Sequence, residues 1–148
     1  MRGVIQRVAS ARVVVAGTLV SAIQSGLLLL LGIAHADTEV QANWLLDKVL
    51  GLRVFEDEHG KFARSLRDVR GELMVVSQFT LLADTRKGRR PSFAGAAPPA
   101  QAVALYEHLV ARARNQGLAV ATGSFGARMQ VELVNDGPVT IVLDTVER

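Results

Sequence analysis

Short apolar runs separated by turn-forming residues recur along the chain and predict a protein built largely from β-strands. The runs are rich in Val, Ile and Leu, and their lengths suit strands better than helices. Gly-containing breaks, such as Gly17-Thr18, separate them. The expected strands cover residues 1–9, 12–16, 19–23, 27–34, 53–55, 71–79, 118–122, 129–134 and 139–143.

Two stretches have helical periodicity instead. Thr38 and Gln41 have the spacing of a capping box, and apolar residues follow at intervals of three and four. Pro98 and Pro99 suit the first turn of a second helix, and Gly117 suits its end. Together the strands and the two one-sided helices predict an α/β fold. Mostly antiparallel or mixed sheets would be covered on one face by both helices, in a single domain over residues 1–148.

Composition places the chain among ordinary globular proteins. Its 148 residues are 49% hydrophobic and 21% charged, which suits one domain with a sizeable core. The apolar run at residues 27–34 is too short to span a bilayer and begins too late for a signal peptide. We therefore expect a buried strand there and a cytoplasmic protein.

The residue inventory excludes the common catalytic sets. There is no cysteine, and His35, His59 and His108 lack the spacing of a metal site or a catalytic triad. We expect no metal and no cofactor. The net charge of +3 is compatible with a polyanionic partner and equally with a slightly basic protein that has none. Catalysis, if present, would depend on positioning, backbone donors, a hydroxyl or the substrate's own groups.

Three segments are candidates for a functional site. Ser77-Gln78-Phe79-Thr80 ends an apolar strand, where side chains are held rigidly, although these residues could equally serve only the fold. A basic loop follows, and it would either contact phosphates or be a solvated charge run. Its cations are Arg86, Lys87, Arg89 and Arg90.

The third segment is Gly137-Pro138, which lies between two apolar runs. A hairpin turn is one interpretation. The other is a cis peptide bond, because bonds that precede proline are the main place where cis bonds occur. A cis bond turns two successive carbonyls to the same side, and such a rigid pair of acceptors would hold an ammonium group.

Taken together, these segments resemble the D-aminoacyl-tRNA deacylase family of chiral proofreading enzymes. The resemblance covers essentially the whole chain, and the order and spacing of Ser-Gln-Phe-Thr, the basic loop and Gly-Pro-Val-Thr make it specific. The segments that carry it are residues 1–8, 52–57, 77–93, 125–129 and 135–140.

The resemblance implies a homodimer of layered ββα subunits with active sites at the interface and no membrane association. Residues 77–80 would line the aminoacyl pocket, and Phe125 and Met129 would hold the terminal adenosine of tRNA. A cis Gly137-Pro138 would reach into the partner's site.

The implied reaction is hydrolysis of an aminoacyl ester to a free D-amino acid and tRNA. Carbonyls of Gly137 and Pro138 would bind the substrate ammonium, so that an L side chain collides with the proline and a D side chain points outward. Glycine, which has no side chain to exclude, would also be removed, including glycine mischarged on alanine tRNA. Backbone N–H groups near Gln78 and Phe79 would stabilise the oxyanion. Either Thr80 or, as we favour, the ribose 2′-hydroxyl would assist attack.

Two rival functions use part of the same pattern. A dimeric RNA-binding module would need the basic loop and Phe125 but not a rigid Gly-Pro. A hydrolase of another small ester or amide would have no use for the basic loop.

Overall fold

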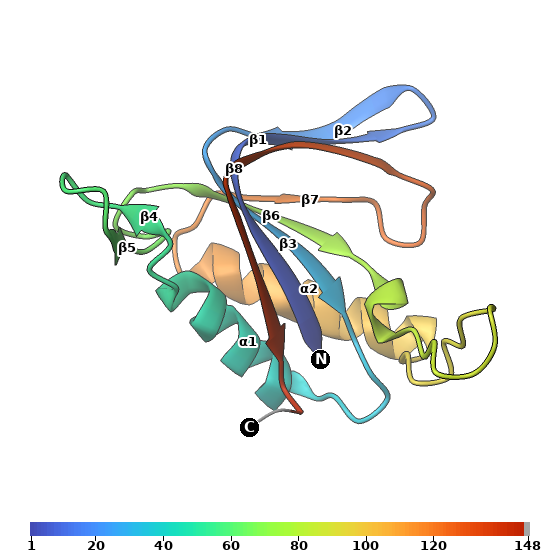
Figure 1. The fold of residues 1–148 in the computed structure, drawn as a ribbon. Helices are drawn as coiled ribbons and strands as arrows, with labels where there is room; N and C mark the ends of the chain where they lie inside the picture. The colour runs from blue at the N-terminus through green and yellow to red at the C-terminus, as the bar shows by residue number, and fades with distance from the viewer. Residues whose placement is uncertain (147–148) are drawn as a thin grey trace.

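In a computed structural model that describes residues 1–146, a curved mixed sheet carries two helices on one face (Figure 1). The elements follow in the order β1 (Arg2–Val15), β2 (Thr18–Ile23), β3 (Gly26–Gly32), α1 (Glu39–Gly51), β4 (Phe55–Glu56), β5 (Phe62–Arg64), β6 (Glu72–Ser77), the 3₁₀ helix η1 (Phe79–Leu82), α2 (Pro99–Asn115), β7 (Val120–Thr122) and β8 (Gln130–Asp144).

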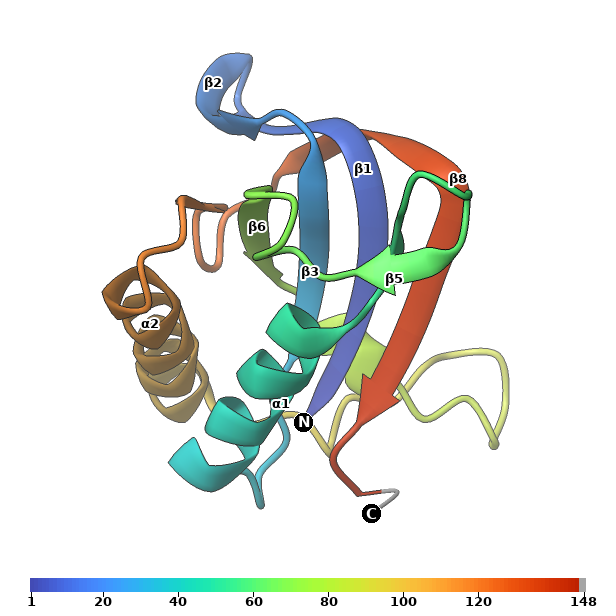
Figure 2. The ribbon, with the colours of Figure 1, turned by 90° about the vertical axis from the view of Figure 1, so that its left-hand side faces the viewer.

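The main sheet has the strand order β2-β1-β3-β6-β7, and β8 also pairs with β1. β1 runs antiparallel to β2, β3 and β8, whereas β6 runs parallel to β3 and to β7. Parallel neighbours need a crossover connection. α1 lies in the crossover from β3 to β6 and α2 in that from β6 to β7, which places both helices on one face of the sheet (Figures 1 and 2).

β1 is long enough to belong to two layers. Its residues Arg2 to Val8 pair with β3, and its residues Ala11 to Val15 pair with β2. The second half of β1, with β2 and the start of β8, folds over the face of β3 and β6 that lies away from the helices (Figure 1). The result is a layered ββα arrangement, as expected.

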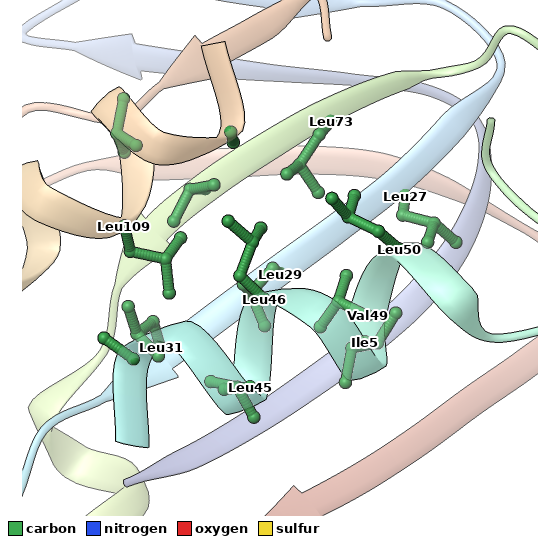
Figure 3. Packing of buried hydrophobic residues seen from close by; sticks show 14 of the residues in the cluster. Ile5, Leu27, Leu29, Leu31, Leu45, Leu46, Val49, Leu50, Leu73 and Leu109 are labelled. Atoms are coloured by element: carbon green, nitrogen blue, oxygen red, sulfur yellow. The ribbon is translucent and has the colours of Figure 1, made fainter. Parts of the chain in front are cut away.

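This layering explains why residues 27–31 are continuously apolar. Side chains alternate between the two faces of a strand. Leu27, Leu29 and Leu31 pack against Leu45 and Leu46 of α1 (Figure 3). Leu28 packs on the opposite face in the core between the two β-layers. Both faces of β3 are therefore buried.

The helices begin where the sequence predicts. Thr38 Oγ1 accepts a hydrogen bond from Val40 N at 3.2 Å, and Thr38 N donates to Gln41 Oε1 at 2.9 Å. The bond from Thr38 N is one half of a capping box, in which the Thr38 side chain also accepts from the backbone of Gln41. Pro99 is the first residue of α2, where its missing N–H has no cost. None of the helices within residues 1–146 is long and apolar enough to cross a membrane.

Several predicted boundaries are wrong. The runs expected at residues 1–9 and 12–16 are one continuous strand, β1, because β8 pairs with both of them, and the strand expected over residues 27–34 ends at Gly32. The strand expected over residues 71–79 ends at Ser77, because the chain bends into η1 with Leu81 N donating to Gln78 O. The two strands expected on either side of Gly137-Pro138 are one strand, β8, so the segment is no hairpin turn. Both halves of β8 pair with β1, and the register shifts between them. Gly137-Pro138 is thus a bulge within a continuous strand.

Candidate active site at the end of β6

A cavity of about 680 Å³ opens where β6 ends, and it brings together several residues predicted from the sequence. Its walls are mostly apolar with a few polar groups, the composition usual for a small-molecule site. Three segments far apart in sequence form it: the end of β6 with η1, the start of α2, and the loop before β8. The predicted site residues that line it are Ser77, Gln78, Phe79, Phe125 and Met129.

The strand end holds its residues through one backbone bond. Gln78 N donates to Leu31 O at 2.8 Å, which continues the parallel pairing of Leu31 with Ser77 for one more residue. The N–H of Gln78 is therefore committed to the fold. By contrast, the N–H groups of Phe79 and Thr80 bond to no backbone acceptor in residues 1–146, as expected at a helix start.

Thr80 is exposed, and its Oγ1 accepts a hydrogen bond from the side-chain amide of Gln78. Within residues 1–146, no histidine, lysine or carboxylate contacts this hydroxyl. No group of three or more His, Cys, Asp or Glu side chains in the same part of the chain is placed to hold a metal ion. Thr80 does not itself line the cavity. The polar groups at or next to this end of the cavity are hydroxyls, an amide and backbone N–H groups.

Phe125 and Met129 form another part of the cavity wall. The ring of Phe125 packs on Tyr106 with centroids 5.9 Å apart. Met129 Sδ accepts a hydrogen bond from Ser124 N at 3.3 Å, and a Cβ at Gly123 would lie only 2.8 Å from it. Gly123 therefore makes the space that the thioether occupies.

Tyr106 of α2 supports this wall, because it packs against Phe125. Its hydroxyl donates to Val75 O at 2.8 Å, and burial raises the pKa of Tyr106 to about 12. The phenol is consequently protonated near neutral pH, as a hydrogen-bond donor must be. This contact joins α2 to β6 directly beside Gly123, whose N–H reaches the same carbonyl at 3.1 Å.

The predicted basic loop is closed at its base. Asp84 N donates to Ser92 O at 2.8 Å and Ser92 N to Asp84 O at 2.9 Å. Arg86 does not carry a free charge, because its Nη2 lies 2.6 Å from Asp84 Oδ2. Hydrogen bonds from Arg86 hold the pKa of Asp84 well below its usual value. Within the described residues, the loop's other cations form no ion pair; they are Lys87, Arg89 and Arg90.

Gly137 and Pro138 lie elsewhere in the chain and do not line the cavity. Both are exposed, and the peptide bond between them is cis. They bulge from β8 opposite Arg7 of β1.

Arg7 holds this bulge in place and is a residue that the sequence reasoning missed. It is only 7% exposed. Its Nε donates to Asp136 O at 3.1 Å, and its Nη1 donates to Val54 O at 2.6 Å. Asn135 Nδ2 adds bonds to Arg7 O at 2.9 Å and to Val139 O at 3.0 Å. The one available signal was a charged residue within the apolar first strand.

The strand registers show how far the bulge lies from the cavity of its own chain. Three strand spacings separate β8 from β6, about 14 Å in total. Arg7, opposite the bulge, is four residues along β1 from Gly3, which pairs with Leu31 beside Ser77, and this adds about 13 Å along the strand. The structure therefore does not bring Gly137-Pro138 to residues 77–80 of the same subunit.

Comparisons with known proteins identify the family to which the chain belongs. The model of the D-Tyr-tRNA(Tyr) deacylase family matches residues 4–144. A D-aminoacyl-tRNA deacylase of Herpetosiphon aurantiacus is 57% identical over 147 residues, which cover 99% of this chain and 96% of that protein. Its counterpart in Stutzerimonas stutzeri is 59% identical over 145 residues, covering 98% and 100%.

Among solved structures, the c-Myc DNA Unwinding Element Binding Protein superposes with a TM-score of 0.92 at 44% identity, covering 98% of this chain and 99% of that one. The family model and the two relatives span nearly the whole sequence. The chain therefore belongs to the D-Tyr-tRNA(Tyr) deacylase family.

Proposed function

We propose that the protein hydrolyses the ester of D-aminoacyl-tRNA to a free D-amino acid and tRNA, and that it rejects L-aminoacyl-tRNA. The observation that carries the proposal is the cavity in which residues 77–79 meet Phe125 and Met129, in a chain of this family. One wall has the aromatic and thioether surface that an adenine ring needs, and another has unused backbone donors.

In this arrangement the terminal adenosine of tRNA lies against Phe125 and Met129, which directs its ester toward the strand end. The N–H groups of Phe79 and Thr80 then face the carbonyl oxygen, where negative charge develops during attack. Gln78 contributes its side chain and not its N–H, which already bonds to Leu31 O. Water adds to the carbonyl carbon, the bond to the ribose oxygen breaks, and that oxygen takes up the proton lost by water and becomes a hydroxyl.

The vicinal 2′-hydroxyl of the ribose assists this attack in our proposal. A threonine nucleophile needs a base to accept its proton, and within residues 1–146 the Thr80 hydroxyl contacts the Gln78 amide and no base. The RNA would thus supply a reactive group, and the protein would supply geometry and oxyanion stabilisation.

Chiral selection requires Gly137 and Pro138 from a second copy of the chain. The separation within one subunit supports this, as does the exposure of both residues. The neighbouring carbonyls of Asp136 and Val139 are already bonded to Arg7 and Asn135. The carbonyls of Gly137 and Pro138 would bind the substrate ammonium, and the proline ring would exclude an L side chain. Glycyl esters, including glycine on alanine tRNA, would not be excluded by the proline ring and would be hydrolysed.

The decisive experiment measures release of amino acid from three substrates. They are D-Tyr-tRNA, L-Tyr-tRNA and alanine tRNA mischarged with glycine. We expect release from the D-tyrosyl and glycyl substrates only. A D-tyrosyl substrate that ends in 2′-deoxyadenosine should react roughly a hundredfold or more slowly. Equal release from both tyrosyl enantiomers would refute chiral selection, and full-rate hydrolysis of the deoxy substrate would refute the assisting hydroxyl.

A second candidate function is nucleic-acid binding without catalysis. The name of the 44% identical structural relative describes a DNA-binding protein, and the three unpaired cations of the basic loop would suit such a role. The same assay separates the two candidates, because a binding module releases no amino acid from any of the substrates.

A further inference from the structure

Two phenylalanine side chains at the edge of the cavity are unusually exposed to solvent. Phe79 is 56% exposed and Phe93 is 37% exposed, and their rings meet edge to face with centroids 5.1 Å apart. Phe62, another exposed phenylalanine, has the guanidinium of Arg7 over its ring at 5.4 Å. Phe79 and Phe93 have only each other as an aromatic or cationic partner among residues 1–146. They form an apolar, π-rich surface open to solvent.

This surface lies directly beside the basic loop. Phe93 follows Ser92, which closes the base of the loop with Asp84. The loop projects beyond η1 and away from the body of the protein (Figures 1 and 2). Because Asp84 neutralises Arg86, the available charges belong to Lys87, Arg89 and Arg90. Open aromatic rings that line the edge of the cavity are therefore joined, through Ser92, to a loop that carries three unpaired cations.

Aromatic rings next to cations are the features that bind single-stranded nucleic acid. Bases stack on the rings whatever their sequence, and the cations contact the phosphates between them. Another protein would be a poorer occupant, because three unpaired cations on one short loop favour a polyanion. The proposed substrate provides such a segment, since two unpaired cytidines precede the terminal adenosine of every tRNA.

We propose that Phe79 and Phe93 form a stacking platform for these two cytidines, with Lys87, Arg89 and Arg90 contacting their phosphates. This subsite rests on the proposed function and extends it from the terminal adenosine to the preceding nucleotides. The side chain of Phe79 would bind RNA while its N–H faces the ester. The subsite reads no base sequence, so it would serve the shared end of all tRNAs.

The test compares three ligands by competition binding: adenosine, the trinucleotide CCA, and an analogue of CCA in which two abasic sugars precede the adenosine. The analogue keeps the phosphates and removes the stacking bases. We expect the wild-type protein to bind CCA more tightly than the abasic analogue by roughly thirtyfold or more, because two stacked bases are lost. Phe93→Leu removes one of the two rings, so it should reduce this difference roughly fivefold or more and leave adenosine binding unchanged. Phe93→Tyr, which keeps the ring, should retain the full difference.

The phosphate contacts need a separate variant. Lys87→Ala combined with Arg89→Ala should weaken binding of CCA and of the abasic analogue alike, and should reduce the dependence of both on salt. Adenosine binding should not change. Lys61→Ala, which removes an exposed cation from the distant β4–β5 turn, is the matched control and should alter none of the three affinities.

Equal affinity of the wild-type protein for CCA and the abasic analogue would overturn the platform, as would a Phe93→Leu variant that loses adenosine binding equally. The outcome is independent of the deacylase assay. A protein that prefers CCA but releases no D-tyrosine would retain this subsite and lose the proposed activity. One that hydrolyses D-Tyr-tRNA without preferring CCA would retain the activity and lose the subsite.

Discussion

At the scale of single residues, Gly137 has little freedom to change. Its φ is +130°, and a Cβ there would lie 2.7 Å from Val139 Cγ2 and 2.9 Å from Val139 N. Gly137→Ala should therefore destabilise the protein by about 1–3 kcal/mol. It should also lower kcat/KM for D-Tyr-tRNA roughly a hundredfold, because the displaced carbonyls would no longer meet the substrate. Urea unfolding and the deacylase assay measure the two effects.

Gly17→Ala is the matched control for this substitution. Gly17 also has a positive φ, +80°, but a Cβ there would meet nothing within 4 Å. The control should cost about 1 kcal/mol of stability and leave the deacylase rate unchanged. Full activity in Gly137→Ala would show that the backbone at this position has no part in the reaction.

Sequence reasoning succeeded where a residue's role depends on its neighbours in the chain. Ser77, Gln78 and Phe79 could be placed at a strand end because the apolar run before them is unmistakable. Arg7 could not be found in this way, since its acceptors Val54 O and Asp136 O are 47 and 129 positions away. Nothing in the local pattern reports such contacts.

At the scale of secondary-structure elements, Tyr106 joins α2 to β6. Tyr106→Phe removes the bond to Val75 O but leaves that carbonyl with its bond from Gly123 N. We therefore expect a loss of only about 1 kcal/mol at neutral pH, measured by urea unfolding.

The same residue predicts a dependence on pH. The pKa of Tyr106 is raised from 10.0 to about 12 by burial, so the folded state binds this proton more tightly than the unfolded state. The contribution to stability is complete below pH 10 and is lost as the pH rises toward 12. The free energy of unfolding of the wild-type protein should therefore fall toward that of Tyr106→Phe in that range. If the difference in unfolding free energy between the two proteins stays constant between pH 9 and 11, the raised pKa of Tyr106 is contradicted.

The elements also show where sequence patterns fail. The capping box of α1 and the proline start of α2 are local signals, and the structure has both. The break at Gly137-Pro138 suggested two strands, yet β8 continues through it because both of its halves pair with β1 at the other end of the chain. A partner more than a hundred residues away decided the outcome, and local propensity could not reveal it.

At the scale of the whole molecule, the separation of the bulge from the cavity predicts subunit complementation. Phe125→Ala damages the cavity and Gly137→Ala damages the bulge, so each variant alone should be nearly inactive. If one subunit serves the cavity of the other, a mixed dimer contains one intact site. An equal mixture that exchanges freely should recover about a quarter of wild-type activity, because half of its dimers are mixed and each has one working site of two.

The control mixture combines the wild-type protein with the double variant that carries both substitutions. Its mixed dimers contain no intact site, so activity should fall below the proportion of wild-type protein present. If the single variants do not complement each other after subunit exchange has been verified, each chain serves its own cavity and the dimeric proposal is wrong.

The small β4–β5 hairpin carries none of the groups assigned to the reaction, yet the hairpin and the residue before it contact the Arg7 guanidinium in two ways. Val54 O, just before β4, accepts from its guanidinium, and Phe62 of β5 lies beneath it. Arg7 in turn fixes Asp136 beside the bulge. In the proposed function, damage to this hairpin would therefore displace the bulge much as Gly137→Ala does, and would slow hydrolysis of D-Tyr-tRNA without touching a residue of the cavity.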